Sequence, residues 1–266
     1  MQNFTYHQPT TLAEAKQLLL ENEDAKILSG GMTLFPTMKM RLAAPSDLID
    51  LSSIADLRGI QVSDTEVKIG AMTTHSEVAY SRTLRSELAI LPQVASLIGD
   101  AQVRNRGTIG GSLSNSDPAA DYPAAALGLD AVIITDGREI AAADYFQGLF
   151  ETALDEHEIL TAVRFAKPVR AAYIKFPNPA SRYAVVGVLV AQMADGSSRV
   201  AVTGAAACAY RELKFEQALN HNFSVTALGG LESEATDLNQ DVFASADYRR
   251  HLIGVMARRA VKQMDE

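Results

Sequence analysis

Apolar positions along the chain follow two spacings, one typical of helices and one typical of strands. Helical spacing places apolar residues on one face of the segments 12–19, 86–98, 215–220 and 248–264. Short apolar or alternating runs predict strands at residues 4–6, 25–28, 48–51, 132–135, 139–141, 159–165, 172–176, 184–192 and 199–203. The alternation of Val62, Val67 and Ile69 predicts a hairpin that ends at Gly70. Strands and helices alternate in the first part of the chain, whereas strands precede helices in the last part. This order predicts an α+β protein.

The residues Lys167-Pro168 mark a boundary in this pattern. We expect a first domain at 1–168, made of subdomains at about 1–55 and 56–168, and a second, smaller domain at 169–266. The second domain would contain a sheet followed by helices. A chain of 266 residues is long enough for two or three such units, each with a core of its own.

Two glycine pairs occupy related places in this pattern. Gly30-Gly31 follows a predicted strand, and Gly110-Gly111 precedes a helix that we expect to hold Pro118 in its first turn and to run through Leu127. Glycine permits positive φ and close approach of a ligand, and the N–H groups at a helix start attract phosphate. Neither pair has the G-x-G-x-x-G spacing of the Rossmann fingerprint. A phosphate-binding loop and a plain tight turn both remain open at this point.

Charge and composition exclude several classes of function. The net charge of −8 argues against a polyanion such as DNA as the main partner. No apolar run approaches the ~18 residues of a membrane helix, and the first seven residues lack a secretory signal, so a cytoplasmic location is expected. With Cys208 as its one cysteine, the chain cannot ligate an iron–sulfur cluster by itself, and its five histidines lack metal-ligand spacing.

Several segments together resemble a known family, the FAD-binding medium subunits of molybdenum hydroxylases, in particular those of the aerobic carbon monoxide dehydrogenase and xanthine dehydrogenase type. The matching segments occur in the family's order over essentially the whole chain. The longest and most specific places Val103-Arg104-Asn105-Arg106 between the two glycine pairs. The segments are Leu28 to Leu34 (LSGGMTL), Ile69 to His75 (IGAMTTH), Ile98 to Gly111 (IGDAQVRNRGTIGG), Asp117 to Asp121 (DPAAD), the stretch around Lys175, and Ala244 to Arg249 (ASADYR).

The resemblance implies a fold and a function. The fold would be a two-part FAD-binding domain of the vanillyl-alcohol-oxidase type, followed by a small C-terminal α/β domain of the carbon monoxide dehydrogenase flavoprotein type. The chain would be an oxidoreductase subunit whose FAD accepts electrons from the iron–sulfur clusters of a small partner subunit and passes them to NAD, a quinone or another acceptor. A large partner subunit would hold the molybdenum cofactor and select the substrate. Carbon monoxide, purines, aldehydes and N-heteroaromatics all remain open as substrates.

The resemblance also implies which residues bind FAD. Ser29–Leu34 and Thr108–Ser112 would embrace the pyrophosphate, and Asp121 would bind ribose or ribityl hydroxyls. Lys175 would lie near the polar edge of the flavin, where a cation stabilises reduced anionic flavin. Tyr183 would either cover the isoalloxazine face or pack in the core. The expected cofactor-binding residues, with no catalytic residue and no metal ligand among them, are Lys26, Leu28, Ser29, Gly30, Gly31, Met32, Thr33, Leu34, Ile98, Ala101, Thr108, Gly110, Gly111, Ser112, Asn115, Asp121, Leu160, Lys175 and Tyr183.

Two further functions stay open beside electron transfer. One is a non-catalytic flavin-binding or assembly module of the same fold, and the other is a self-sufficient flavin oxidase, for which the chain has little length to spare. If a cluster-bearing partner docks at the flavin opening, we expect the docking surface near residues 98–106 and 175–183. Three basic residues, Arg104, Arg106 and Arg182, would contribute to it, although basic loop residues are more often merely solvated.

Overall fold

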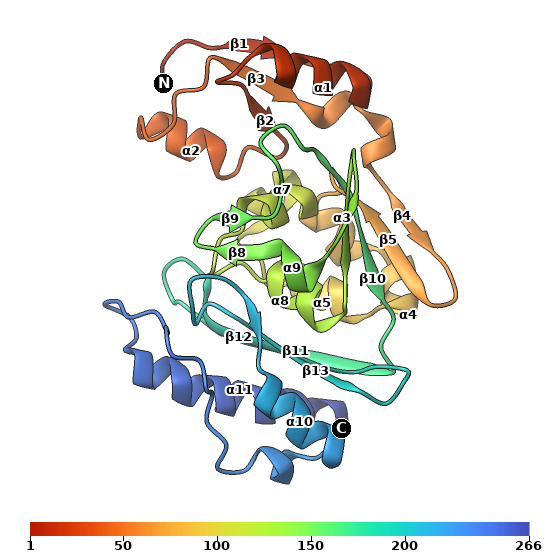
Figure 1. Cartoon of the computed structure of the whole chain (residues 1–266), viewed down its shortest axis with the longest axis vertical. Helices are drawn as coiled ribbons and strands as arrows, with labels where there is room; N and C mark the ends of the chain where they lie inside the picture. The colour runs from red at the N-terminus through yellow and green to blue at the C-terminus, as the bar shows by residue number, and fades with distance from the viewer. Residues whose placement is uncertain (266) are drawn as a thin grey trace.

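Three sheets stacked along the long axis organise residues 1–265, the part of the chain that the computed structural model describes (Figure 1). The N-terminal lobe lies at one end, the largest sheet with most of the helices lies in the middle, and the C-terminal sheet with the longest helix lies at the other end. The fold is thus mixed helix and sheet with interleaved elements, as the apolar pattern predicts.

The N-terminal lobe is a small parallel sheet of strand order β1-β3-β2 with two helices. Helix α1 begins after Thr11, whose hydroxyl caps the helix by accepting a hydrogen bond from the Glu14 N–H at 3.2 Å. The elements are β1 (Thr5–His7), α1 (Leu12–Glu21), β2 (Lys26–Leu28), α2 (Leu34–Lys39), β3 (Asp47–Asp50) and the 3₁₀ turns η1 (Leu51–Ser53) and η2 (Ala55–Leu57).

The middle layer is an antiparallel sheet of strand order β4-β5-β10-β6-β7, packed against a group of short helices. Its strands are β4 (Ile60–Val62), β5 (Glu66–Gly70), β6 (Val132–Thr135), β7 (Glu139–Ala141) and β10 (Leu160–Ala166), with a separate hairpin of β8 (Phe146–Gly148) and β9 (Glu151–Thr152). Its helices are α3 (His75–Tyr80), α4 (Arg82–Glu87), α5 (Ile90–Ser96), α6 (Ala101–Arg106), α7 (Ile109–Asn115), α8 (Tyr122–Gly128) and α9 (Ala142–Tyr145).

The C-terminal sheet separates two hydrophobic cores. Its central strand β12 is buried on both faces: Leu189 packs with the core of the middle layer, whereas Val188 and Val190 pack with helix α11. The elements are β11 (Arg170–Pro177), β12 (Ala184–Gln192), β13 (Ser198–Thr203), β14 (Tyr210–Arg211), α10 (Leu213–His221), η3 (Val225–Leu228) and α11 (Ala246–Asp265). The alternation of side chains along one buried strand therefore joins the last sheet to the rest of the molecule.

Three details differ from the sequence-based expectations. Pro118 lies before helix α8, in a turn whose Asp117 side chain accepts from the Ala119 N–H, so the helix starts four residues later. Residues 101–106 form helix α6 because the Asp100 carboxylate caps it at the Val103 N–H. The apolar segment 86–98 is divided between α4 and α5 by Leu88, whose φ and ψ are not helical.

A search of residues 1–265 finds no helix that combines the length and the apolar character needed to cross a membrane.

Candidate functional site

A cavity of about 930 Å³ draws its lining from all three parts of the molecule, a size near the upper end of cofactor sites. The N-terminal lobe contributes residues 25–34, and the middle layer contributes groups within 98–121 and the loop 152–160. The C-terminal sheet contributes Lys175 and the β11–β12 turn at 180–183. Segments far apart in the sequence therefore converge on one site.

The two glycine loops touch each other in the cavity wall. The Thr108 hydroxyl donates to the Ser29 hydroxyl at 3.3 Å across 79 positions of sequence. A Cβ at Gly30 would overlap the carbonyl of Arg106, and a Cβ at Gly111 would overlap the Ser29 hydroxyl. The glycines thus allow the two loops to pack together, a role different from the expected clearance for a ligand.

The loops differ in the backbone donors that they leave free. In the first turn of α7 the donors are used: the N–H groups of Ile109 and Gly110 donate to Thr73 and Ala71 carbonyls, and that of Gly111 donates to the Thr108 hydroxyl. Within residues 1–265, by contrast, the backbone N–H groups of 30–34 make no hydrogen bond. Consecutive free N–H groups in a turn form an anion-binding concavity, so the first loop is the better donor for a diphosphate.

A buried ion pair forms another part of the wall. Lys175 Nζ lies 2.7 Å from Asp121 Oδ2 and also donates to the Leu97 carbonyl at 3.1 Å. The Tyr173 hydroxyl donates to Asp121 Oδ1 at 2.6 Å. Asp121 is 4% exposed, and this burial raises the pKa of its carboxyl, while Lys175 and Tyr173 oppose the rise. The lysine that the resemblance implies at the flavin edge is therefore already paired with the implied sugar-binding carboxylate.

A neutral histidine lies next to this wall. Burial, together with the charge of Arg104, lowers the pKa of His75 to about 4, so the imidazole is uncharged at neutral pH. The ring packs against Tyr122 with centroids 5.3 Å apart, and a Cβ at Gly107 would meet its Nε2 at 2.6 Å. His75 thus adds shape without charge to the cavity.

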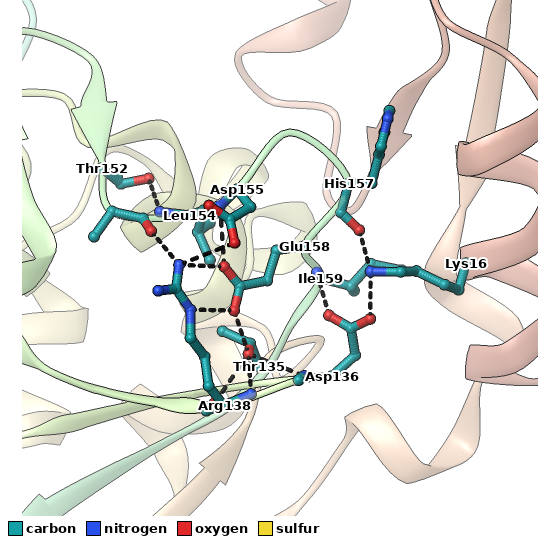
Figure 2. A network of polar contacts seen from close by, with 12 residues as sticks. Lys16, Thr135, Asp136, Arg138, Thr152, Leu154, Asp155, His157, Glu158 and Ile159 are labelled. Atoms are coloured by element: carbon teal, nitrogen blue, oxygen red, sulfur yellow. Dashed lines mark hydrogen bonds and ion pairs between the residues drawn. The ribbon is translucent and has the colours of Figure 1, made fainter.

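A polar network holds the loop 152–160 in place (Figure 2). The Arg138 guanidinium makes two hydrogen bonds to Glu158, at 2.9 and 2.8 Å, and Thr135 donates to the same carboxylate at 2.6 Å. These contacts lower the pKa of Glu158 to about 2, and the hydrogen bond from Arg138 has the largest effect. Beside them, Lys16 of the N-terminal lobe pairs with Asp136 at 2.7 Å and donates to the His157 carbonyl at 2.6 Å.

Of the cofactor-binding residues expected from the resemblance, all but Ala101 line this cavity. Ala101 is the first residue of α6 and is exposed, and the cavity lining stops just before it at Ile98, Gly99 and Asp100. Tyr183 lines the cavity with 47% of its surface exposed, so it lies at the rim and does not pack in the core. Further lining residues that the sequence does not indicate as cofactor-binding are His75, Leu154, Asp155, Glu156, Glu158 and Arg182, although His75 belongs to a matching segment and Arg182 to the expected docking surface.

No group of three or more histidine, cysteine, aspartate or glutamate side chains in residues 1–265 is arranged to hold a metal ion. Cys208 is half-buried, and its thiol lies 3.8 Å from the Phe146 carbonyl.

Comparison with known proteins gives matches over nearly the whole chain. A family model described as the FAD binding domain in molybdopterin dehydrogenase matches residues 2–168. The carbon monoxide dehydrogenase medium chain of Afipia carboxidovorans is 38% identical, over 98% of this chain and 96% of that protein. The nicotine 6-hydroxylase medium subunit of Paenarthrobacter nicotinovorans is 32% identical, over 96% of this chain and 95% of that protein. These two relatives are named for different substrates.

A solved structure gives the same result. Reconstituted CO dehydrogenase from Oligotropha carboxidovorans superimposes on this chain with a TM-score of 0.93 at 36% identity. The match covers 99% of this chain and 98% of the other. The similarity therefore includes the C-terminal sheet and helices as well as the part that the family model matches.

Proposed function

The chain belongs to the family of FAD-binding subunits of molybdopterin dehydrogenases, and from this premise we propose that the cavity between its layers is the FAD site. Its homologues are oxidoreductase subunits, and the chain is an FAD-binding medium subunit of this kind. The observation that carries the proposal is the contact of the two glycine loops beside five free backbone N–H groups at 30–34. This donor set fits a diphosphate without a bulky cation.

Each part of the cavity has a role in this proposal. FAD, when bound, supplies two-electron redox chemistry, and the residues of the chain bind and orient it. The diphosphate goes to 29–34 and 108–112, with Asn115 beside it. The apolar side chains of Ile98 and Leu160 serve the flavin and adenine slots, and Tyr183 at the rim covers the ring. All of these residues except the buried Ile109 line the cavity, which supports the assignment.

The partners and the acceptor follow from the relatives' names and from the family. We propose a large subunit that holds the molybdenum cofactor and a small subunit whose iron–sulfur clusters deliver electrons to this chain. NAD and a quinone are the candidate acceptors, and the cytoplasm is the proposed location. We also propose that 1–168 and 169–266 are separate domains and that the first is divided near residue 55. A new sheet begins at Arg170, just after the first boundary, and another begins at Ile60, just after the second.

The test starts from the purified full-length chain. Flavin absorbance and a titration of the flavin-free chain should give one FAD per chain. Alone, the chain should oxidise none of carbon monoxide, purines, aldehydes or N-heteroaromatics, and co-expression with its large and small subunits should restore turnover of one of them. Failure to bind FAD would favour the assembly module, and turnover by the lone chain would favour a self-sufficient oxidase.

A further inference from the structure

The buried ion pair of the cavity wall has a third member that does not line the cavity. Tyr173 is buried behind Asp121 and donates to its Oδ1, while Lys175, two residues further along the same strand, binds Oδ2. Residues two apart on a strand face the same side of the sheet. One strand, β11, thus supplies both partners of a single carboxylate.

The neighbouring strand leaves room for this arrangement. Gly187 lies opposite Lys175 in the β11–β12 pair, and a Cβ at this position would overlap the Tyr173 hydroxyl. Glycine weakens the interior of a strand, and the other residues of buried β12 are mostly valine, leucine and alanine. The glycine at 187 therefore has a local reason, which is to admit the phenol oxygen next to Asp121.

The backbone that carries Asp121 is held independently of Tyr173. The N–H of Gly204 donates to the Pro118 carbonyl at 2.7 Å, and the Thr203 hydroxyl donates to the Ala120 carbonyl at 2.6 Å. Ala184 N–H adds a contact to Ala119 at 3.3 Å. Loss of the phenol would therefore change the environment of the carboxylate and leave the chain that carries it in place.

We propose that Tyr173 is a positioning residue that keeps Asp121 ionised against Lys175, so that the two charges cancel in the wall of the cofactor site. Burial favours a neutral acid, whereas a hydrogen bond donated to a carboxylate favours the charged form. Without the phenol, Asp121 takes up a proton more readily, and the charge of Lys175 is then no longer balanced. Among the described residues, the charge of Asp121 also acts on Tyr183 and on the adjacent Tyr122, and Asp117 lines the same cavity.

The protonation state of Asp121 should affect electron uptake by the flavin, an inference that rests on the proposed function. With Asp121 ionised, the pair presents no net charge to the flavin. With Asp121 protonated, Lys175 presents a positive charge, which favours electron uptake by the flavin. Tyr173 thus influences the pH at which Asp121 becomes protonated. Above that pH the Asp121–Lys175 pair no longer changes the electron affinity of the flavin.

The first experiment needs no FAD. Infrared spectra of the flavin-free full-length chain are recorded as a function of pH, and the carboxylic acid band of Asp121 is followed. This band is assigned to Asp121 because it should be absent in Asp121→Asn. Tyr173→Phe should shift the protonation equilibrium on the order of tenfold toward the acid, the expected effect of one hydrogen bond to a charged group. Gly187→Ala, which displaces the hydroxyl without removing it, should shift the equilibrium the same way. Tyr210→Phe should not change the equilibrium, because Tyr210 is a half-buried tyrosine of the same sheet whose hydroxyl hydrogen-bonds to Ser233.

Site-specific replacement of Tyr173 by 3-fluorotyrosine makes this phenol a stronger hydrogen-bond donor, so the protonation equilibrium of Asp121 should shift in the opposite direction. If the infrared band of Asp121 titrates identically in the wild-type, Tyr173→Phe and fluorinated proteins, the inference is overturned. The second experiment measures the midpoint potential of the FAD-loaded chain against pH. If the band shifts in Tyr173→Phe but the potential does not follow it, the role of Tyr173 stands and the placement of the flavin edge at Lys175 fails.

Discussion

At the scale of single residues, the backbone conformation or a close protein contact explains each of two glycines in the cavity wall, Gly31 and Gly110. Gly31 has a φ of +71°, which residues with a side chain rarely adopt, so its backbone conformation alone explains it. Gly110 has no such conformation, but a Cβ there would lie 2.6 Å from the Ala71 Cβ and 2.8 Å from its carbonyl oxygen. Glycine motifs of this kind can therefore mark where two loops close on each other around a ligand.

Gly110→Ala should for this reason weaken FAD binding without touching FAD. Overpacking at such a contact costs roughly 1–3 kcal/mol, so the start of α7 should shift and FAD affinity should fall at least about tenfold. Titration of the flavin-free variant by flavin fluorescence measures the affinity, and thermal unfolding should show a lower Tm. Gly137→Ala is the matched control, since a Cβ at 137 meets nothing within 4 Å in the described chain. Wild-type affinity and Tm in Gly110→Ala would contradict this account.

The sequence predicts residues of the site unequally. The glycine loops, Asp121 and Lys175 belong to recognisable motifs, and they do line the cavity. Tyr173 belongs to no motif, because its role depends on the register of β11 against β12 and on a glycine in the partner strand. The sequence also does not predict the ion pair between Lys16 and Asp136, because no local pattern links residues that lie 120 positions apart. Motifs report contacts to a ligand, and the supporting contacts behind them need the fold.

At the scale of elements, the loop 152–160 joins the cavity to the sheet of the middle layer. It contributes several lining residues, and the Arg138–Glu158 pair fixes it to the β6–β7 turn (Figure 2). The Glu158 carboxylate is 6% exposed and accepts from Arg138, Thr135 and the Asp155 N–H. A carboxylate so enclosed is costly to leave unpaired. The loop should therefore depend on Arg138 for its position.

Arg138→Gln should destabilise the chain in a way that depends on pH. The pKa of Glu158 in the folded chain, about 2, lies below the ordinary glutamate value of 4.5, so its contribution to stability is present above about pH 4.5 and is lost as pH falls toward 2. The difference in Tm between wild type and variant should be roughly 2–8 °C at pH 7 and should narrow below pH 4.5. Arg164→Gln is the control, because its partner Glu139 is 51% exposed and exposed pairs contribute little. A Tm difference independent of pH would contradict this role for Glu158.

Elements were predictable where one local signal dominates. Strands β11, β12 and β13 and helix α11 match the apolar pattern closely, whereas the two-residue strand β14 was not predicted. Apolar character alone does not decide burial where tertiary contacts are lacking: Met40 and Leu42 are 63% and 75% exposed. Gly110-Gly111 lies inside the first turn of α7, although glycine disfavours helices, because only glycine fits against Ala71 and Ser29.

At the scale of the whole molecule, the cavity depends on all three layers, and its rim is where a partner must approach the cofactor. Of the three arginines expected at a docking surface, Arg104 is used internally, since it donates to the carbonyls of Ile98 and Gly99 at 2.9 and 3.2 Å. Arg182 lines the cavity at the β11–β12 turn, and Arg106 is exposed at the end of α6. Arg106 and Arg182 therefore remain the candidates for contact with the small subunit at the docking surface.

Charge reversal at these two positions should weaken assembly selectively. Charges at the rim of an interface chiefly affect association rate and its salt dependence, so Arg106→Glu with Arg182→Glu should lower capture of the small subunit about tenfold at low salt and less at high salt. The control is Arg259→Glu on α11, an exposed arginine outside the cavity lining in the layer furthest from the N-terminal lobe (Figure 1). Co-purification and surface-immobilised binding at two salt concentrations measure the effect, with flavin absorbance confirming that FAD is retained. Equal loss of binding in the control and the double variant, or none in either, would mean that the small subunit docks elsewhere and that the rim arginines are only solvated.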